Sequence, residues 1–208
     1  FPNGKTALVD AGNTTSTFDN GERVIVPLLN YLGIKKIDYG IVSHIDTDHY
    51  GGFVELILQG VIGEVFKPEI DTSISKDKRF EKFVRERGIP VSYYKEEKME
   101  VGNTAIYFLY DEEIKIISGE STNNRSNVIK IVYGETSFLF TGDIEKNVEK
   151  FYAGKYRYFL ESDVLKVGHH GSKTSSSDEF VKYVSPEISL ISAGFKNKFG
   201  HPAKDVIQ

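Results

Sequence analysis

Cysteine and tryptophan are absent from this chain of 208 residues, and methionine occurs once. Without cysteine the chain can form neither a disulfide framework nor a thiolate metal site. No apolar run approaches the roughly 20 residues that cross a bilayer, and no signal peptide is visible. The 39% of residues that are apolar suffice for one sizeable core, and no linker interrupts the chain, so we expect a single domain over residues 1–208.

An excess of positive charge is also missing. The chain has 26 Lys and Arg residues against 30 Asp and Glu residues, a net charge of −4. Proteins that bind polyanions through general electrostatics are usually basic, which argues against such a role. Bound dications would reverse the local field, however, so the net charge decides little.

The chain opens with Phe1-Pro2-Asn3-Gly4, which indicates a hairpin turn between two strands. The strand that should precede this turn is missing from the sequence. We therefore expect an excised domain or an incomplete chain, so that any membrane-spanning or export segments would lie outside these residues.

Histidine is scarce, and the five histidines lie in Gly-flanked segments that resemble loops. We expect none of them on a helix face or in a core strand. They are His44, His49, His169, His170 and His201.

The most informative run, Ser43 to Gly52, reads SHIDTDHYGG and follows an apolar run typical of a strand. Residues i and i+2 of an extended chain point the same way, so His44 and Asp46 can converge on one ion. Asp48 and His49 are adjacent and must diverge unless the chain turns there. The simplest geometry is two ions side by side, because four charged or metal-binding groups would otherwise repel one another. The alternative is a solvated acidic turn with two incidental histidines.

Two further segments repeat this pattern of strand, glycine and ligand. We expect the glycines at 51 and 52 to form a tight turn into a helix over residues 53–59. The segment from Ser137 to Asp143 ends in one carboxylate after a Gly turn, and that from Asp163 to Ser172 carries the adjacent His169 and His170. Each segment alone is weak evidence for a site, but together they indicate a metal centre with a bridging Asp143.

These motifs resemble the metallo-β-lactamase superfamily, and within it the β-lactamase-like domain of ComEC-type DNA-internalization competence proteins. The resemblance covers nearly the whole chain, from Lys5 to about Val206. It is carried by LVDAG at 8–12, HIDTDHYGG at 44–52, NRSNV at 124–128, TGD at 141–143, KVGHHGS at 166–172 and FGHP at 199–202. The fold that it implies is an αββα sandwich, here without its first strand.

The resemblance implies six ligands for two divalent ions, Mn²⁺ or Zn²⁺: His44, Asp46, Asp48, His49, Asp143 and His169. In that scheme His44 and Asp46 hold the first ion, and Asp143 bridges it to the second. Three further residues would lie around these ligands: Asp10, Asn124 and His170.

The chain departs from the superfamily between Ser121 and Ser126, where a further histidine is usual and none occurs. The first ion therefore has fewer protein ligands, and Asn124 or water would complete it. Such a donor set is harder than three imidazoles, which brings Mn²⁺ into consideration beside Zn²⁺.

Catalytic and substrate roles follow less directly. Asp48 and Asp143 would orient the nucleophile. His201 would protonate the leaving oxygen or bind phosphate, although a capping histidine on a surface loop is the alternative. Ser172 and Lys173 precede a helix expected at Asp178, whose backbone N–H groups would favour an anion, although plain N-capping explains such serines as well.

Hydrophobic patterns predict alternating strands and helices. Strands are expected at 5–10, 37–42, 61–66, 91–94, 105–109, 114–117, 128–133, 137–140 and, as a last buried strand, 187–191. Helices are expected at 22–32, with Pro27 kinking or starting the helix, and at 77–87, 145–151 and 178–183. We expect the basic outer face of the helix at 77–87 to be solvated: Lys76, Lys78, Arg79, Lys82, Arg85 and Arg87.

Two adjacent ions can supply hydroxide and clamp a phosphodiester, and no Ser/His/Asp or Cys nucleophile is evident. We therefore interpret the chain as a metal-dependent phosphodiesterase. The resemblance implies a nuclease that degrades the non-transported DNA strand, with single-stranded DNA as partner, at the outer side of a bacterial cytoplasmic membrane during natural competence. Two alternatives stay open: a free-standing phosphorylcholine-esterase-like hydrolase or lactonase, and a non-catalytic module that passes single-stranded DNA to a channel.

Overall fold

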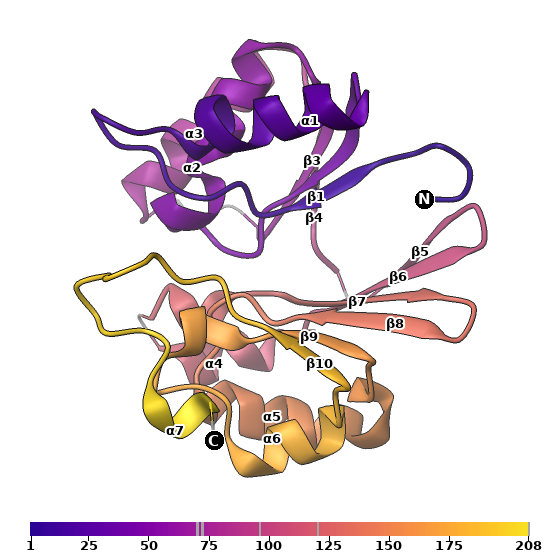
Figure 1. The fold of residues 1–208 in the computed structure, drawn as a ribbon, viewed down its shortest axis with the longest axis vertical. Coiled ribbons are helices and arrows are strands. Elements are labelled where there is room, and N and C mark those ends of the chain that lie inside the picture. Colours follow the sequence, from indigo (N-terminus) through magenta and orange to yellow (C-terminus); the bar gives the residue numbers. More distant parts are fainter. Residues whose placement is uncertain (70, 72, 96, 120, 208) are drawn as a thin grey trace. The chain divides into compact units, whose positions relative to one another are not determined.

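The computed structural model describes residues 1–69, 71, 73–95, 97–119 and 121–207. The chain divides into two units, Phe1–Tyr94 (unit 1) and Lys95–Gln208 (unit 2). Each unit has its own β-sheet and its own hydrophobic core, and in each the helices cover one face of the sheet (Figure 1).

Unit 1 contains a parallel sheet in the order β1-β2-β3-β4. Parallel neighbours require crossover connections, and the helices of this unit provide them. The strands are β1 (Ala7–Val9), β2 (Ile37–Ile41), β3 (Ile62–Lys67) and β4 (Val91–Tyr93). Each of the four strands expected in this half of the sequence is confirmed.

The helices of unit 1 pack on the sheet through one apolar face. Phe53 and Leu56 from one helix and Phe80 and Val84 from another lie in the same buried cluster as Val65 of β3. The helical segments are η1 (Gly21–Ile25), α1 (Val26–Leu32), α2 (Thr47–Leu58) and α3 (Ser75–Glu86). Pro27 lies in the first turn of α1, where the π-helical segment η1 passes directly into the α-helix.

The expected start of the second helix is wrong. Helix α2 begins at Thr47 rather than at residue 53, so His49 lies on a helix and Gly51 and Gly52 lie inside it. A Cβ on Gly52 would lie 2.2 Å from the Ala11 carbonyl oxygen. The glycines therefore serve a close approach of α2 to the chain that follows β1, not a turn.

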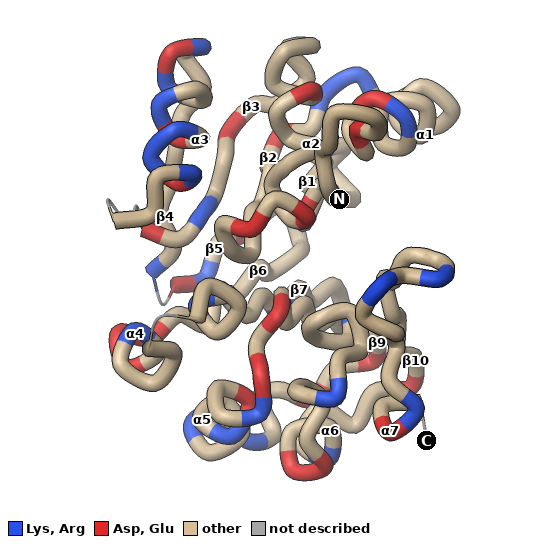
Figure 2. Tube along the Cα trace, turned by 90° about the vertical axis from the view of Figure 1, so that its left-hand side faces the viewer, with Lys and Arg blue, Asp and Glu red and all other residues tan. Residues whose placement is uncertain are grey.

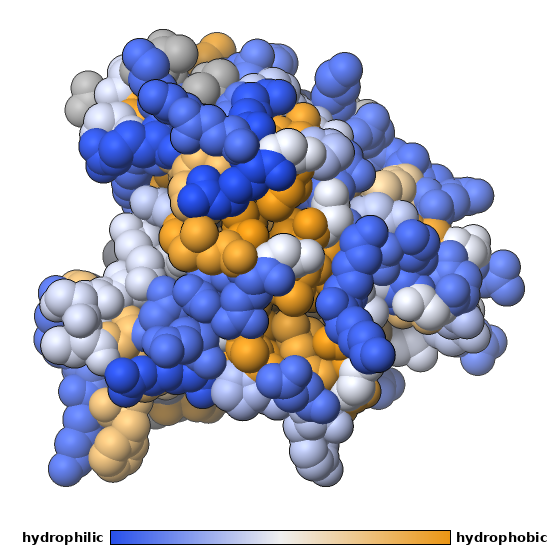
Figure 3. All heavy atoms as spheres, turned by 90° about the horizontal axis from the view of Figure 1, so that it is seen from above, coloured by the Kyte–Doolittle hydropathy of each residue, from blue (hydrophilic) through white to orange (hydrophobic). Residues whose placement is uncertain are grey.

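The outer side of unit 1 combines two kinds of surface. Lys and Arg residues recur along α3 (Figure 2), whereas Phe80 of the same helix is buried. On α1, Leu28 and Leu32 lie four residues apart and are about half exposed, 51% and 55%. Apolar side chains are visible on the face shown in Figure 3.

Unit 2 contains a mixed sheet in the order β10-β9-β8-β7-β6-β5. Its strands from β5 to β8 pair antiparallel, whereas β8, β9 and β10 pair parallel. The strands are β5 (Glu97–Val101), β6 (Thr104–Leu109), β7 (Val128–Tyr133), β8 (Thr136–Phe140), β9 (Val164–Lys166) and β10 (Ile188–Leu190). Strand β5 was not expected, and β10 is exposed rather than buried.

Helices of unit 2 cover the sheet through Val148, Tyr152 and Phe180, which join Leu139 and Leu165 in one core. The segment expected as a strand at 114–117 is a helix instead, because Ile114 is buried while Ile116 is 82% exposed. The helical segments are α4 (Glu113–Ser118), η2 (Asn123–Arg125), α5 (Lys146–Tyr156), η3 (Arg157–Leu160), η4 (Gly168–Gly171), α6 (Asp178–Val184) and α7 (Lys204–Ile207). Among the described residues, no helix combines the length and apolarity needed to cross a bilayer.

Candidate metal centre

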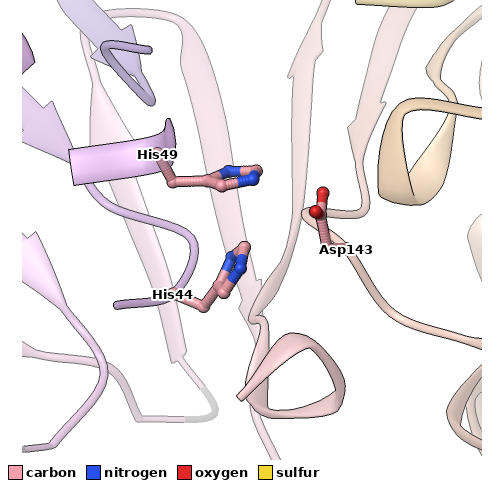
Figure 4. A group of neighbouring side chains, drawn as sticks. All are labelled: His44, His49 and Asp143. Carbon is pink, nitrogen blue, oxygen red and sulfur yellow. The ribbon is translucent and has the colours of Figure 1, made fainter. Parts of the chain in front are cut away.

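Two histidines of unit 1 lie next to each other where the loop after β2 leads into α2 (Figure 4). His44 belongs to the loop and His49 to the first turn of the helix. Their ring centroids are 4.0 Å apart. Asp46 occupies the N-cap position between them, with an extended backbone that turns the chain from the loop into the helix. The sequence motif thus becomes a pair of neighbouring imidazoles.

Asp10 fixes the orientation of His49. It follows β1 with a positive φ of 58°, and its carboxylate accepts hydrogen bonds from Ser43 N at 2.8 Å and Ser43 Oγ at 2.8 Å. His49 Nδ1 lies 2.7 Å from Asp10 Oδ2. An ionised carboxylate only accepts, so Nδ1 carries the hydrogen and Nε2 keeps its lone pair for a ligand. This is the outer position that the sequence resemblance implied for Asp10.

Ser43 is a site residue that the motif did not single out. Its Oγ lies 3.1 Å from His44 Nδ1 and 3.3 Å from His49 Nδ1, and it also donates to Asp10. The only signal in the sequence is its place directly before the first histidine. Ser43 therefore links the two imidazoles to one carboxylate.

Asp46 and Asp48 differ in their surroundings. Asp46 Oδ2 lies 3.4 Å from His44 Nε2, so the i and i+2 residues converge as the sequence predicts. The other oxygen of Asp46 accepts a hydrogen bond from Lys76 of α3. The expectation that Lys76 is solvated is therefore wrong. Asp48 is exposed on α2 and the adjacent His49 is buried, yet a carboxylate oxygen of Asp48 and a ring nitrogen of His49 lie within 4.8 Å of each other, because the chain turns into the helix at this point.

In unit 2, Asp143 follows β8 in a turn where Gly142 has a φ of 52° (Figure 4). Its backbone N–H donates to Ser126 Oγ at 2.9 Å. Its Oδ2 lies 3.4 Å from His170 Nε2. The Gly-assisted turn expected from the sequence thus presents the carboxylate to a histidine of the same unit.

The two adjacent histidines after β9 have different partners. His170 Nδ1 donates to the Ser192 carbonyl at 2.7 Å, which leaves Nε2 toward Asp143. His169 Nε2 lies 3.3 Å from Asn123 Nδ2, and His169 Nδ1 lies 3.2 Å from Thr174 Oγ1. The sequence assigned the ligand role to His169, whereas the imidazole beside Asp143 belongs to His170.

Asn124 and Glu145 form a pair that supports this side of unit 2. Asn124 Oδ1 accepts from the Glu145 N–H at 2.8 Å, and its Nδ2 donates to Glu145 Oε2 at 3.2 Å. The other oxygen of Glu145 lies 3.5 Å from His169 Nδ1. Asn124 is therefore engaged with Glu145, which no sequence pattern singled out, and its expected place beside the metal ligands stays a prediction.

His201 lies beside His169, with ring centroids 5.8 Å apart, and stacks on Phe199 at 5.7 Å. Burial lowers the pKa of His201, and the neighbouring His169 and His170 lower it further. A lowered pKa favours the neutral imidazole, which accepts a proton more readily than it donates one. The expected role of proton donor stays a prediction.

The serine run before α6 does not present its backbone freely to anions. The N–H groups of Ser176 and Ser177 donate to the Glu149 carboxylate at 2.5 and 2.7 Å. Ser172 is buried, and its Oγ lies 3.0 Å from Thr174 Oγ1. Lys173 is exposed. The anion site expected at this helix start is thus taken by a carboxylate of the chain, and phosphate binding by Lys173 stays a prediction.

The donor groups fit a transition-metal ion. Unit 1 offers His44, Asp48 and His49, and unit 2 offers Asp143 and His170, as candidate ligands. His49 and His170 each have Nδ1 bonded to an oxygen acceptor of the chain, the arrangement that orients metal-bound histidines in proteins. Imidazole and carboxylate together suit Mn²⁺ or Zn²⁺ better than Mg²⁺.

Comparison with known proteins agrees with these motifs. The family model described as metallo-beta-lactamase superfamily matches residues 2–194. ComE operon protein 3 of Bacillus subtilis (strain 168) is 33% identical over 97% of this chain and 27% of that protein. Competence protein ComA of Neisseria gonorrhoeae is 33% identical over 98% of this chain and 27% of that protein. The chain thus spans about a quarter of the length of these relatives.

Solved structures show the same fold at low sequence identity. The metallo-beta-lactamase fold protein YhfI of Bacillus subtilis aligns over 98% of this chain and 81% of that protein, with a TM-score of 0.60 and 18% identity. This structural similarity supports only the expected fold class. From the family match and the sheet-and-helix layers of each unit, the chain belongs to the metallo-β-lactamase superfamily and is a metallo-β-lactamase-fold hydrolase related to competence proteins.

Proposed function

We propose that the chain is a metal-dependent phosphodiesterase, a nuclease domain that acts on the non-transported DNA strand during DNA uptake. The observation that carries the proposal is the pair His44 and His49, with His49 held by Asp10 so that Nε2 can bind a metal ion. The similarity to two competence proteins supports the link to DNA uptake. Display at the outer side of the cytoplasmic membrane, through segments outside these residues, is part of the same proposal.

A bound divalent ion supplies Lewis acidity and a hydroxide nucleophile at neutral pH. The residues of this chain would hold and surround it. The candidate ligands are, taken unit by unit, His44 and His49 within unit 1, and Asp143 and His170 within unit 2. Asp48, exposed beside His49, would orient the attacking oxygen as well as bind metal. Because no Ser or Cys nucleophile is evident in the sequence, the proposed chemistry needs no covalent intermediate with the protein.

The substrate would be held mainly through its phosphates. Lys173, Lys196 and Lys198 are exposed or half-exposed basic residues of unit 2 that could meet them. Since the chain is acidic overall, we expect few such contacts and a shallow salt dependence, with on the order of a few phosphates neutralised.

The test is cleavage of labelled single-stranded DNA by the metal-stripped chain after addition of Mn²⁺, Zn²⁺ or Mg²⁺. We expect cleavage with Mn²⁺ above that with Mg²⁺, falling as salt rises. Asp48→Ala and His49→Ala should abolish it and leave the circular dichroism spectrum unchanged. Glu55→Gln, on the same helix as Asp48 and His49, is the matched control and should keep activity.

Two results would replace the proposal. Rapid hydrolysis of small phosphodiesters with DNA untouched at every salt concentration would indicate a free-standing hydrolase. DNA binding without cleavage under any metal would indicate a non-catalytic DNA-binding module.

A further inference from the structure

The carboxylate expected at the first metal ion already has a cationic partner within unit 1. Lys76 Nζ donates to Asp46 Oδ1, while Asp46 Oδ2 lies 3.4 Å from His44 Nε2. Lys76 and Asp46 are 30 residues apart in the sequence. An ammonium therefore lies on the carboxylate that, with His44, was expected to bind a divalent cation.

The backbone beside Lys76 is fixed by a buried ion-pair network. Lys67, which is fully buried at the end of β3, lies 2.8 Å from Asp77 Oδ1 and 3.3 Å from Glu81 Oε2. Asp77 is the residue directly after Lys76, and its other oxygen accepts the Asp71 N–H at 2.9 Å. Breaking a buried ion pair by removing one partner is strongly destabilising, so this network holds the first turn of α3 firmly.

Contact between α2 and α3 fixes the position of Asp46, the other partner of the ion pair. Asp46 immediately precedes α2, and Tyr50 in the first turns of α2 packs on Phe80 of α3 with ring centroids 4.7 Å apart. Lys76 is 29% exposed, whereas Lys82 farther along the same helix is 75% exposed. Lys76 thus differs from the solvated lysines of α3 in its burial as well as in its ion-pair partner.

We propose that the Lys76 ammonium takes the place of the first divalent cation, so that this chain holds a single transition-metal ion tightly, on the His49 side of the site. The inference rests on the proposed function and specifies its metal requirement. The stretch between Ser121 and Ser126, where the sequence resemblance led us to look for a further ligand of that ion, contains no histidine.

An ammonium has part of the chemistry of the ion that it would replace. It is a compact positive charge with three hydrogen-bond donors, so it can neutralise Asp46 and attract a phosphate oxygen. It has no empty orbital, so it does not convert bound water into hydroxide as a metal does. Generation of the nucleophile would therefore remain with one ion, and Lys76 would contribute charge toward the substrate.

The test is metal loading of the full 208-residue chain. The chain is stripped with a chelator, titrated with Mn²⁺, and analysed by elemental analysis and by electron paramagnetic resonance, which separates isolated from exchange-coupled Mn²⁺. Four variants are compared with the parent: Lys76→Met removes the charge, Lys76→Arg keeps it, and Lys78→Met and Lys82→Met are matched controls on the same helix.

We expect the parent, Lys76→Arg and both controls to bind a single ion with an isolated-ion signal. Lys76→Met should bind a second ion at least about tenfold more tightly than the parent does and should show exchange coupling. Continued binding of the ion on the His49 side by Lys76→Met shows that this variant is folded.

Two opposite results overturn the inference. If the parent binds two coupled ions and Lys76→Met changes nothing, the inference falls while the proposed metal-dependent function stands. If no variant binds any ion, both fall.

Discussion

Asp10 Oδ2 lies 2.7 Å from His49 Nδ1, across 39 residues of sequence. Asp10 follows β1 and His49 opens α2, so the contact exists because β1 and β2 are parallel neighbours whose carboxyl ends meet at one sheet edge. The carboxylate determines which nitrogen of His49 carries the hydrogen. Control of that tautomer is the most direct way in which unit 1 prepares a ligand.

Asp10→Asn should weaken Mn²⁺ binding by about 10- to 100-fold, the size of effect usual for an outer partner of a metal ligand. The amide can present NH₂ to His49, which would shift the hydrogen to Nε2 and remove the ligand lone pair. Titration calorimetry gives the affinity, and ¹⁵N chemical shifts of His49 give the tautomer. Asp38→Asn, which affects the Lys5 ion pair of the same unit instead, is the control. Unchanged affinity in Asp10→Asn would show that the contact does not orient a ligand.

Gly52→Ala should destabilise unit 1 by about 1–3 kcal/mol, because its Cβ would lie 2.2 Å from the Ala11 carbonyl oxygen and the backbone would have to shift. Urea unfolding provides the measurement. Gly154→Ala is the matched control, since it lies within α5 and a Cβ there meets no atom within 4 Å. That control should be neutral or more stable by about 0.5–1 kcal/mol. Equal effects of both substitutions would contradict the close approach of α2 to the chain after β1.

His170→Ala should reduce metal affinity by more than about tenfold, and His169→Ala should reduce it less, because the imidazole 3.4 Å from Asp143 is that of His170. His169 has Asn123 and Thr174 as neighbours, so its removal should lower turnover more than metal binding. Metal content and cleavage rate measured on the same samples separate the two effects. The reverse order of affinities would restore the assignment made from the sequence.

Unfolding of unit 1 in acid should depend on Glu81. Burial raises the pKa of its carboxyl, but hydrogen bonds from Tyr93, Arg85 and Lys67 outweigh burial and leave that pKa below its ordinary value of 4.5. A carboxyl with a lowered pKa in the folded state stabilises the fold above its unfolded pKa, and this contribution is lost as the pH falls from about 4.5 through the folded pKa.

Glu81→Gln should therefore unfold more easily at neutral pH, by about 1–3 kcal/mol, and should lose less stability between neutral pH and pH 3 than the parent. Urea midpoints over a pH series measure both quantities. Glu86→Gln, exposed on the same helix, should leave the pH profile unchanged. A profile for Glu81→Gln that is parallel to that of the parent would refute the role of this carboxyl.

The sequence alone determined the superfamily, most of the strands and the run of candidate ligands between His44 and His49. These features are local. The periodicity of apolar residues indicates which face of a helix or strand is buried, and the position of a motif that directly follows a strand depends only on that strand. The segment 114–117 was predicted as a strand because a short run with three isoleucines fits the period of a strand as well as that of a helix. Only the packing of Ile114 into the core of unit 2 decided between them.

Partners distant in sequence were decided by the tertiary structure. Asp10 contacts His49 because of sheet order, and Lys76 contacts Asp46 because α2 and α3 pack together through Tyr50 and Phe80. Even adjacent residues depended on it: His169 and His170 are identical in chemistry, and only the backbone of the turn after β9 assigns one to Asn123 and the other to Asp143. Periodicity carries no information on such contacts, because they depend on the directions in which separate elements bring their side chains together.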